Sequence, residues 1–225
     1  DDDRSDDDRW LPLPEAADVP LVADLVLQGC SPVATRDELV GRIRDRDEDA
    51  SDATRLALEL LRLDPSRCDV VEALGEFGRW VAHGGPELSA RARACLCLTL
   101  QDRTLRDVVL SRWVPDPFAA DQSLLDDEGV AVWEVIPPLP AALGPRETPS
   151  VHRLLHLAAR VPQEFTPPLL TLAAFLAWHS GDGSVANEAI ELTLQRDPTY
   201  RLALLLNEVL LRGIPPWAMS AAEVA

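Results

Sequence analysis

The sequence predicts an all-α fold of stacked antiparallel helical hairpins. The strongest sign is residues 169–217, where the signals that start helices, the spacing of apolar residues and the signals that stop helices agree with one another. Elsewhere, apolar residues again recur three and four positions apart, which is typical of helices that bury one face. Alternating β-branched runs of strand length between turns do not occur, so the pattern does not favour a sheet.

The C-terminal stretch is expected to fold as helix, turn, helix, turn, helix. A capping residue followed by proline starts a helix, glycine permits a tight turn, and proline ends a helix. In chain order, these signals occur at Thr166-Pro167, Gly181-Asp182-Gly183, Ser184, Asp197-Pro198, Gly213 and Pro215-Pro216. We therefore expect Ser184 to cap the second helix.

Further helices are expected before this stretch. Thr35 and Glu38 have the spacing of a capping box, and Ser66 and Pro86 are further start signals. The polar residues 47–52 are predicted to form a loop between two helices. The expected helices span residues 17–28, 36–46, 53–63, 67–83, 86–101, 104–114, 121–136 and 150–161.

These boundaries divide the chain into four parts. Residues 1–14 are an acidic flexible segment, because the run cannot bury enough apolar surface to become ordered. Residues 15–136 are a helical region, and residues 150–225 are a helical-hairpin region. Residues 137–149 connect them, and their many prolines prevent regular structure. The two helical regions either share one core or fold separately.

The charged residues exclude several classes of function. All 21 basic residues are arginine, so the chain has no lysine for a P-loop, a pyridoxal phosphate Schiff base or a protein-kinase ATP site. The net charge of -17 argues against direct binding to nucleic acid or to an anionic membrane. Such a charge fits solubility in a crowded cytosol, which is the simpler explanation, or a basic partner protein.

Codon bias and location are inferred from the same composition. Exclusive use of arginine, with many alanine and proline residues, suggests a GC-rich genome such as that of an actinobacterium. The sequence begins with Asp1 and shows no hydrophobic signal segment. We therefore expect a cytoplasmic protein, and either a fragment of a longer chain or a chain whose beginning is not given.

The cysteines are expected to be free thiols. Cys30, Cys68, Cys95 and Cys97 contain no Cys-x-x-Cys pair, which argues against a zinc site and a redox pair. Cys95 and Cys97 lie within an apolar helical segment, where buried thiols in a reducing compartment are the favoured interpretation.

Two histidines have the spacing of metal ligands on a helix. His152 and His156 are four residues apart, which places both imidazoles on one face. Arg153 occupies the position where a zinc protease motif needs a glutamate, and a cation there would oppose metal binding. A packing or surface role is therefore favoured, and we expect no metal.

Other motifs also lack a chemical role. The sequence has no Gly-x-Ser-x-Gly elbow, and Gly181 to Ser184 are more typical of a tight turn than of an anion site because Asp182 would repel an anion. The acidic residues 126–128 favour a helix start through the helix dipole. We therefore expect neither catalytic residues nor a cofactor.

The C-terminal stretch contains Trp178, Gly181-Asp182-Gly183, Ala189, Asp197-Pro198 with Tyr200, and Gly213 with Pro215-Pro216. This set of residues resembles a known family, the actinobacterial domain of unknown function numbered four-one-nine-two. Residues 35–39 are similar to an earlier helix start of that family. The resemblance implies that an α/β-like first part is missing here, and it implies no activity because the family has none assigned.

The same region also resembles one degenerate tetratricopeptide unit. Gly181-Asp182, residues 188–190 and Asp197-Pro198 match its pattern, although the spacing differs. Stacked hairpins of that kind expose grooves that bind other proteins.

These observations predict a non-catalytic interaction or regulatory module. The expected partner is another protein, and the net charge favours a basic one. The surface expected to bind it consists of Trp178, Asp182, Tyr200, Arg201 and Trp217. Two alternatives remain at this point: the helical half of an enzyme whose catalytic part is missing from this chain, and an acidic mimic of nucleic acid.

Overall fold

Helices form the whole regular structure of the part of the chain that is described. A computed structural model describes residues 36–114, 125–139, 148–216 and 218, and no strand occurs in these ranges. The all-α class predicted from the sequence is confirmed. Several expectations lie outside the described residues: the acidic segment 1–14, the helix at 17–28, the capping residue Thr35, most of the proline-rich connection and Trp217.

The first two described helices are α2 (Arg36–Arg44) and α3 (Glu48–Leu63). The prediction of a loop over residues 47–52 is wrong, because α3 already begins at Glu48. Asp47 caps it: its Oδ1 accepts the backbone N–H of Ala50 at 3.0 Å. Glu48 and Asp49 in the first turn add negative charge where the helix dipole favours it.

The next helices are α4 (Val70–His83), α5 (Ala90–Thr99) and α6 (Arg103–Trp113). The expected starts at Ser66 and Pro86 are each displaced toward the C-terminus. Residues Pro65–Arg67 instead form the short 3-10 helix η2. The side chains of Asp69, Ser89 and Asp102 cap α4, α5 and α6.

The remaining helices are α8 (Asp127–Val135), α9 (Thr148–Ala158), α10 (Thr166–His179), α11 (Gly183–Arg196) and α12 (Arg201–Leu211), with the 3-10 helix η5 (Gln163–Phe165) before α10. Two predicted caps are wrong. Thr166 is the first residue of α10 rather than its cap, and Asp182 rather than Ser184 caps α11. Aspartate caps as well as serine does, so both positions were compatible with the sequence.

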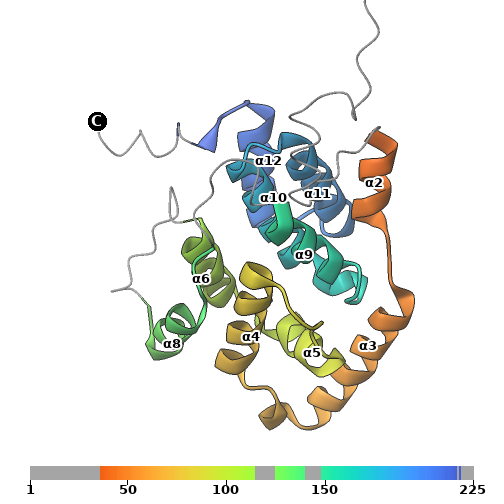
Figure 1. Ribbon diagram of the computed structural model, residues 1–225, viewed down its shortest axis with the longest axis vertical. Helices are drawn as coiled ribbons and strands as arrows, with labels where there is room; N and C mark the ends of the chain where they lie inside the picture. Colours follow the sequence, from red (N-terminus) through yellow and green to blue (C-terminus); the bar gives the residue numbers. More distant parts are fainter. Residues whose placement is uncertain (1–35, 115–124, 140–147, 217, 219–225) are drawn as a thin grey trace, which may run out of the picture. The chain divides into compact units, whose positions relative to one another are not determined.

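Several helices that follow one another in the chain pack against each other (Figure 1). Helix α10 contacts α9 and α11, and α11 contacts α12. Helices α3 and α4 contact α5, while α8 packs on α4 and α6. All residues of α10 from Thr166 to Trp178 are buried, as expected for a helix that is apolar on every side.

The buried residues on the two sides of the proline-rich connection belong to one cluster. It includes Phe77 and Trp113 before the connection and Leu154 and Leu172 after it. Polar contacts also join α4 to α9, because Ser150 Oγ and a guanidinium nitrogen of Arg153 donate to the same carbonyl oxygen of α4, at 3.0 and 2.7 Å. The described residues from Arg36 onward belong to one compact unit.

The structure corrects the expectation for two cysteines. Cys68, which directly follows η2, and Cys95 in α5 form a disulfide, with their Cα atoms 5.5 Å apart. Cys97 is a buried free thiol, and burial raises the pKa of that thiol. Cys30 lies outside the described residues. Among the helices described, none has the length and apolar character needed to cross a bilayer.

Candidate functional site

The tryptophan expected on the binding surface is instead part of the core. Trp178, near the end of α10, is only 4% exposed. Its indole Nε1 donates to the carbonyl oxygen of Ile214 at 3.0 Å, which ties the segment after α12 to α10. The structure therefore gives Trp178 a stabilising contact within the protein.

Asp182 also has a role within the fold. Its Oδ1 accepts the backbone N–H of Val185 at 3.1 Å and so caps α11. The preceding Gly181 has φ +85°, a conformation that glycine adopts more readily than other residues. The turn between α10 and α11 thus uses the Asp182 carboxylate, although the residue is exposed.

Tyr200 and Arg201, in contrast, lie together in a groove of about 470 Å³. They are the last residue before α12 and its first residue. The opposite wall comes from the first two turns of α6 and includes Arg103, Arg106 and Asp107. We call this site the α6–α12 groove. The structure therefore brings together two of the five residues expected on the binding surface.

Arg106 is fixed inside the groove by hydrogen bonds. It is 8% exposed, and its Nε and one terminal nitrogen donate to Asp107 Oδ1 at 2.9 and 2.7 Å. Its other terminal nitrogen donates to the hydroxyl oxygen of Tyr200 at 2.9 Å. The guanidinium carbon also lies 5.4 Å from the centre of the tyrosine ring, within cation–π range.

The environment keeps Tyr200 in its neutral form. Burial raises the pKa of the phenol, even though Arg106 acts in the opposite direction. A protonated phenol with a raised pKa is a poor general base near neutral pH. Tyr200 and Arg106 therefore form a rigid, polar part of the wall.

Two further arginines of the groove have no such contacts. Arg103 and Arg201 are exposed first residues of α6 and α12, and neither guanidinium makes an ion pair or hydrogen bond to any residue described. Asp197 is already engaged, because its Oδ1 accepts the N–H and the hydroxyl of Thr199 at 2.9 and 2.7 Å. The groove has three arginines and two aspartates, so it carries one net positive charge in a chain of net charge -17.

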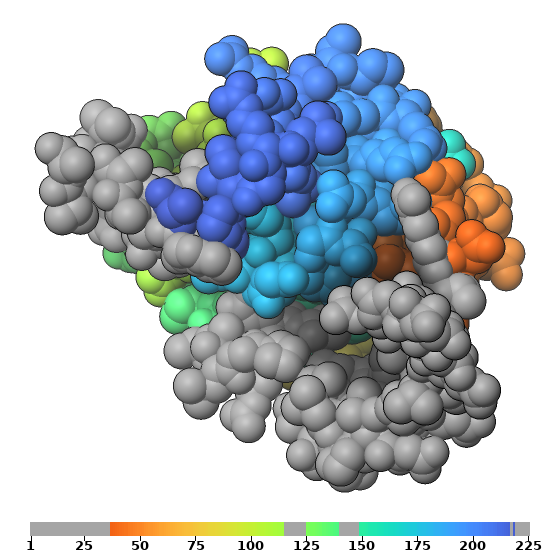
Figure 2. Space-filling model, turned by 90° about the horizontal axis from the view of Figure 1, so that it is seen from above, coloured from red at the N-terminus to blue at the C-terminus, as the bar shows by residue number. Residues whose placement is uncertain are grey.

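One wall of the groove is apolar. Leu202 and Leu205 of α12 line it, and Leu205 is 56% exposed. Leu204 and Leu211 of the same helix are 45% and 74% exposed. Figure 2 shows α12, in dark blue, at the surface beside α11. The site thus combines two arginines that pair with no described residue and an exposed leucine.

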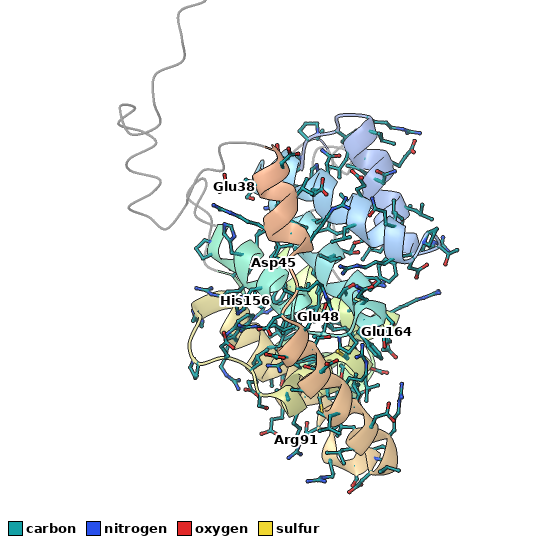
Figure 3. The ribbon with its side chains drawn as sticks, turned by 90° about the vertical axis from the view of Figure 1, so that its right-hand side faces the viewer. Glu38, Asp45, Glu48, Arg91, His156 and Glu164 are labelled. Carbon is teal, nitrogen blue, oxygen red and sulfur yellow. A yellow bond between two sulfur atoms is a disulfide. The ribbon has the colours of Figure 1, made fainter. Side chains whose placement is uncertain are left out.

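A second cluster of charged residues joins α9 to the loop before α5 and to the start of α3. Arg160, just after α9, donates from Nε to Asp47 Oδ2 at 2.9 Å and also pairs with Glu87. His156 Nε2 lies 3.1 Å from the same Glu87 carboxylate. Figure 3 labels His156, on α9, and Glu48, in the first turn of α3, on the same face of the molecule.

The hydrogen bonds from Arg160, and then from His156, lower the pKa of Glu87 to about 2. The cavity beside this cluster measures about 10 Å³, which is the space of a single water molecule at most. His152 and His156 do share a helix, as expected, but His156 is directed to Glu87 and Arg160. We call Asp47, Glu87, His156 and Arg160 the α9 cluster.

Sequence reasoning missed the buried arginines. Arg93 is 7% exposed and donates to Thr54 Oγ1 at 2.8 Å and to the carbonyl oxygens of Leu88 and Ala50 at 2.7 and 3.2 Å. An arginine within the apolar run of α5 was a signal for such a role, because a buried guanidinium needs several acceptors.

Comparison with known proteins identifies one family. A family model described as a domain of unknown function (DUF4192) matches residues 10–217, which is most of the chain. No curated protein and no solved structure matches the sequence or the fold.

Proposed function

Because the chain belongs to the DUF4192 family, whose description assigns no activity, we propose from the structure itself that it is a non-catalytic helical module that binds another protein. The observation that carries the proposal is the α6–α12 groove. It joins exposed apolar side chains to polar groups in one concave surface, and such combinations are typical of sites that bind other proteins.

The chemistry of the groove also favours binding over catalysis. Arginine is not deprotonated at physiological pH and so does not act as a base. Tyr200 has a raised pKa, and the Asp197 carboxylate is held by Thr199. The groove thus presents donors and apolar surface, but no nucleophile paired with a base.

The arrangement of the helices is consistent with such a module. The α10–α11–α12 helices stack as consecutive hairpins, which is the arrangement that gives helical-repeat proteins their binding grooves. We also propose that these hairpins resemble a tetratricopeptide unit, that the protein is cytoplasmic and that its partner is another protein.

One observation favours a second candidate function. Arginines and carboxylates together line the groove, as they do in many sites for charged substrates. The chain would then be the helical half of an enzyme whose catalytic residues lie on another part of a longer protein. Under that hypothesis a small charged molecule, rather than a protein, occupies the groove.

Comparative partner capture tests the proposal. The wild-type chain, an Arg103→Gln/Arg201→Gln variant and an Arg55→Gln/Arg62→Gln control are immobilised and exposed to a lysate of the native host. The control changes two exposed arginines of α3 that pair with neighbours on their own helix. We expect one or more proteins to be retained by the wild type and the control and lost from the groove variant. Equal recovery by all three, or no protein above background, would overturn the proposal.

A further inference from the structure

We propose that the α6–α12 groove binds a peptide segment in which a carboxylate stands next to an apolar side chain. This inference rests on the proposed function and names the chemistry of the partner. It differs from the expectation of a basic partner, because that expectation came from the net charge of the whole chain and the groove has the opposite sign.

Arg103 and Arg201 carry positive charges that no described residue compensates. Both line the same groove, and neither makes an ion pair within the described ranges. A carboxylate accepts two parallel hydrogen bonds from one guanidinium, which makes arginine well suited to bind it. The two guanidinium groups therefore have no acceptor among the described residues, and an anion would satisfy them.

Both arginines lie at an electrostatically unfavourable position on their helices. Each is the first residue of its helix, where the dipole favours anions and disfavours cations. In α3 and α8 the first turn instead carries acidic side chains. The two cations are thus placed at a cost to the free fold, and a bound carboxylate would offset that cost.

The surface beside Arg103 and Arg201 is rigid. Arg106 is already bonded to Tyr200 and Asp107, so it does not need to reorganise when a ligand arrives. A fixed wall beside two arginines that have no described partner lowers the entropy cost of binding.

The aspartates of the groove favour a single carboxylate over a polyanion as the ligand. Asp107 is 57% exposed at the groove and Asp197 also lines it, so a ligand with several closely spaced negative charges would be repelled. Nucleic acid would also approach a chain of net charge -17. A single carboxylate gains the contacts with Arg103 and Arg201 and has the least of this repulsion.

The leucines of the groove indicate that the ligand also has an apolar part. Leu202 and Leu205 line the groove beside the arginines, and Leu205 is 56% exposed. A volume of about 470 Å³ exceeds what one carboxylate group fills and is within the usual range of ligand pockets. A neighbouring leucine-like side chain of the ligand would cover this apolar wall.

The test is a binding titration with a blocked heptapeptide, Gly-Ser-Leu-Asp-Leu-Ser-Gly. Its matched relatives replace Asp by Asn, both Leu by Ser, or Asp by Arg, and inorganic phosphate and a single-stranded DNA decamer are titrated in parallel. Binding is followed by NMR, through the backbone amides of α12 and the Nε–H signals of the arginines. The protein variants are Arg103→Gln/Arg201→Gln and the control Arg55→Gln/Arg62→Gln.

We expect the aspartate peptide to shift signals of α6 and α12, including Arg103 and Arg201. Loss of the carboxylate, or of the two groove arginines, should weaken binding about tenfold or more, as is usual for a charge-assisted hydrogen bond. The control variant should bind like the wild type, and circular dichroism checks that all variants fold.

Equal binding of the aspartate and asparagine peptides would overturn the inference, as would preference for the arginine peptide, for phosphate or for DNA. Absence of any peptide binding would overturn it too. If partner capture still depends on the groove in those cases, the proposed function stands and only the chemistry of the partner is wrong. If capture also fails, the proposed function is wrong as well.

Discussion

The α9 cluster and the α6–α12 groove are both rich in arginine, but they differ in how their charges are satisfied. In the α9 cluster, Arg160 pairs with Asp47 and Glu87, and the adjoining cavity has room for one water molecule at most. In the groove, Arg103 and Arg201 have no described partner and border a cavity of about 470 Å³. The difference suggests that the first site stabilises the fold and that the second is left open for a ligand.

The largest effect is expected where an apolar side chain is closed to solvent. Leu206 and Leu205 are neighbours on α12, but they are 1% and 56% exposed. Leu206→Ala should lower the free energy of unfolding by about 3 kcal/mol, because it leaves a cavity in the core. Leu205→Ala should change it by less than about 0.5 kcal/mol and should weaken partner binding instead. Urea unfolding and partner capture measure the two effects, and similar losses of stability for both variants would contradict the division.

Arg93, like the arginine of the α9 cluster, is held by contacts within the fold, and its substitution tests whether such contacts stabilise the protein. Arg93→Met removes the donors to Leu88 and Ala50 carbonyl oxygens and to Thr54, and we expect a loss of about 2 kcal/mol in unfolding free energy. The matched Arg103→Met variant removes an exposed arginine that has no described contact. Its unfolding free energy should stay within about 0.5 kcal/mol of the wild type. A large loss for Arg103→Met would mean that this residue stabilises the fold.

A smaller effect of opposite sign is expected at Arg201. Arg201→Glu places a negative charge in the first turn of α12, where the helix dipole favours it, so stability should rise by about 0.5 kcal/mol. The same variant should lose binding of the aspartate peptide. Thermal unfolding and the peptide titration are the measurements. A gain in stability with unchanged binding would show that the arginine has no role in the groove.

The smallest effect concerns pH and the α9 cluster. The pKa of Glu87 is lowered to about 2, first by its hydrogen bond from Arg160. A carboxyl group with a lowered folded-state pKa stabilises the protein above its unfolded pKa, and that stabilisation is lost as the pH falls from about 4.5 toward 2. Because Glu87 is more than half exposed, the contribution should stay below about 1 kcal/mol.

The Glu87→Gln variant isolates this contribution from the titration of other carboxylates. The difference in unfolding free energy between wild type and variant should be present at pH 6 and shrink toward pH 2. Urea unfolding across this range measures it. A difference that does not depend on pH would contradict an ionised, paired Glu87 in the folded state.

Helix type was predictable from sequence because periodicity and breakers are local signals. The starts of helices were less so: Asp47, Asp69 and Asp182 act as caps where nearby polar residues had equal claims. Tyr200 and Arg201 are adjacent in the sequence, but Arg106, which lines the same groove, is 94 positions away from Tyr200 in the chain. No local pattern predicts such a contact, because tertiary packing creates it.

Trp178 shows the opposite kind of error. Its helix, α10, is apolar on all sides and buried throughout, and this pattern already argued against a surface role for its tryptophan. The glycines on either side of Asp182 predicted the turn but did not distinguish a structural cap from a binding residue. That distinction needed the hydrogen bond to Val185.

Site-specific photo-crosslinking tests the role of the groove most directly. The chain has no lysine for amine-reactive reagents, so benzoylphenylalanine is placed at Leu205 in the groove or at Leu60 on α3, two leucines that are 56% and 51% exposed. Irradiation in the native host should join a protein to the chain from position 205 and not from position 60, and Arg103→Gln/Arg201→Gln should abolish the product. Crosslinking from position 60 alone, equal crosslinking from both positions, or no product from position 205 would contradict the account.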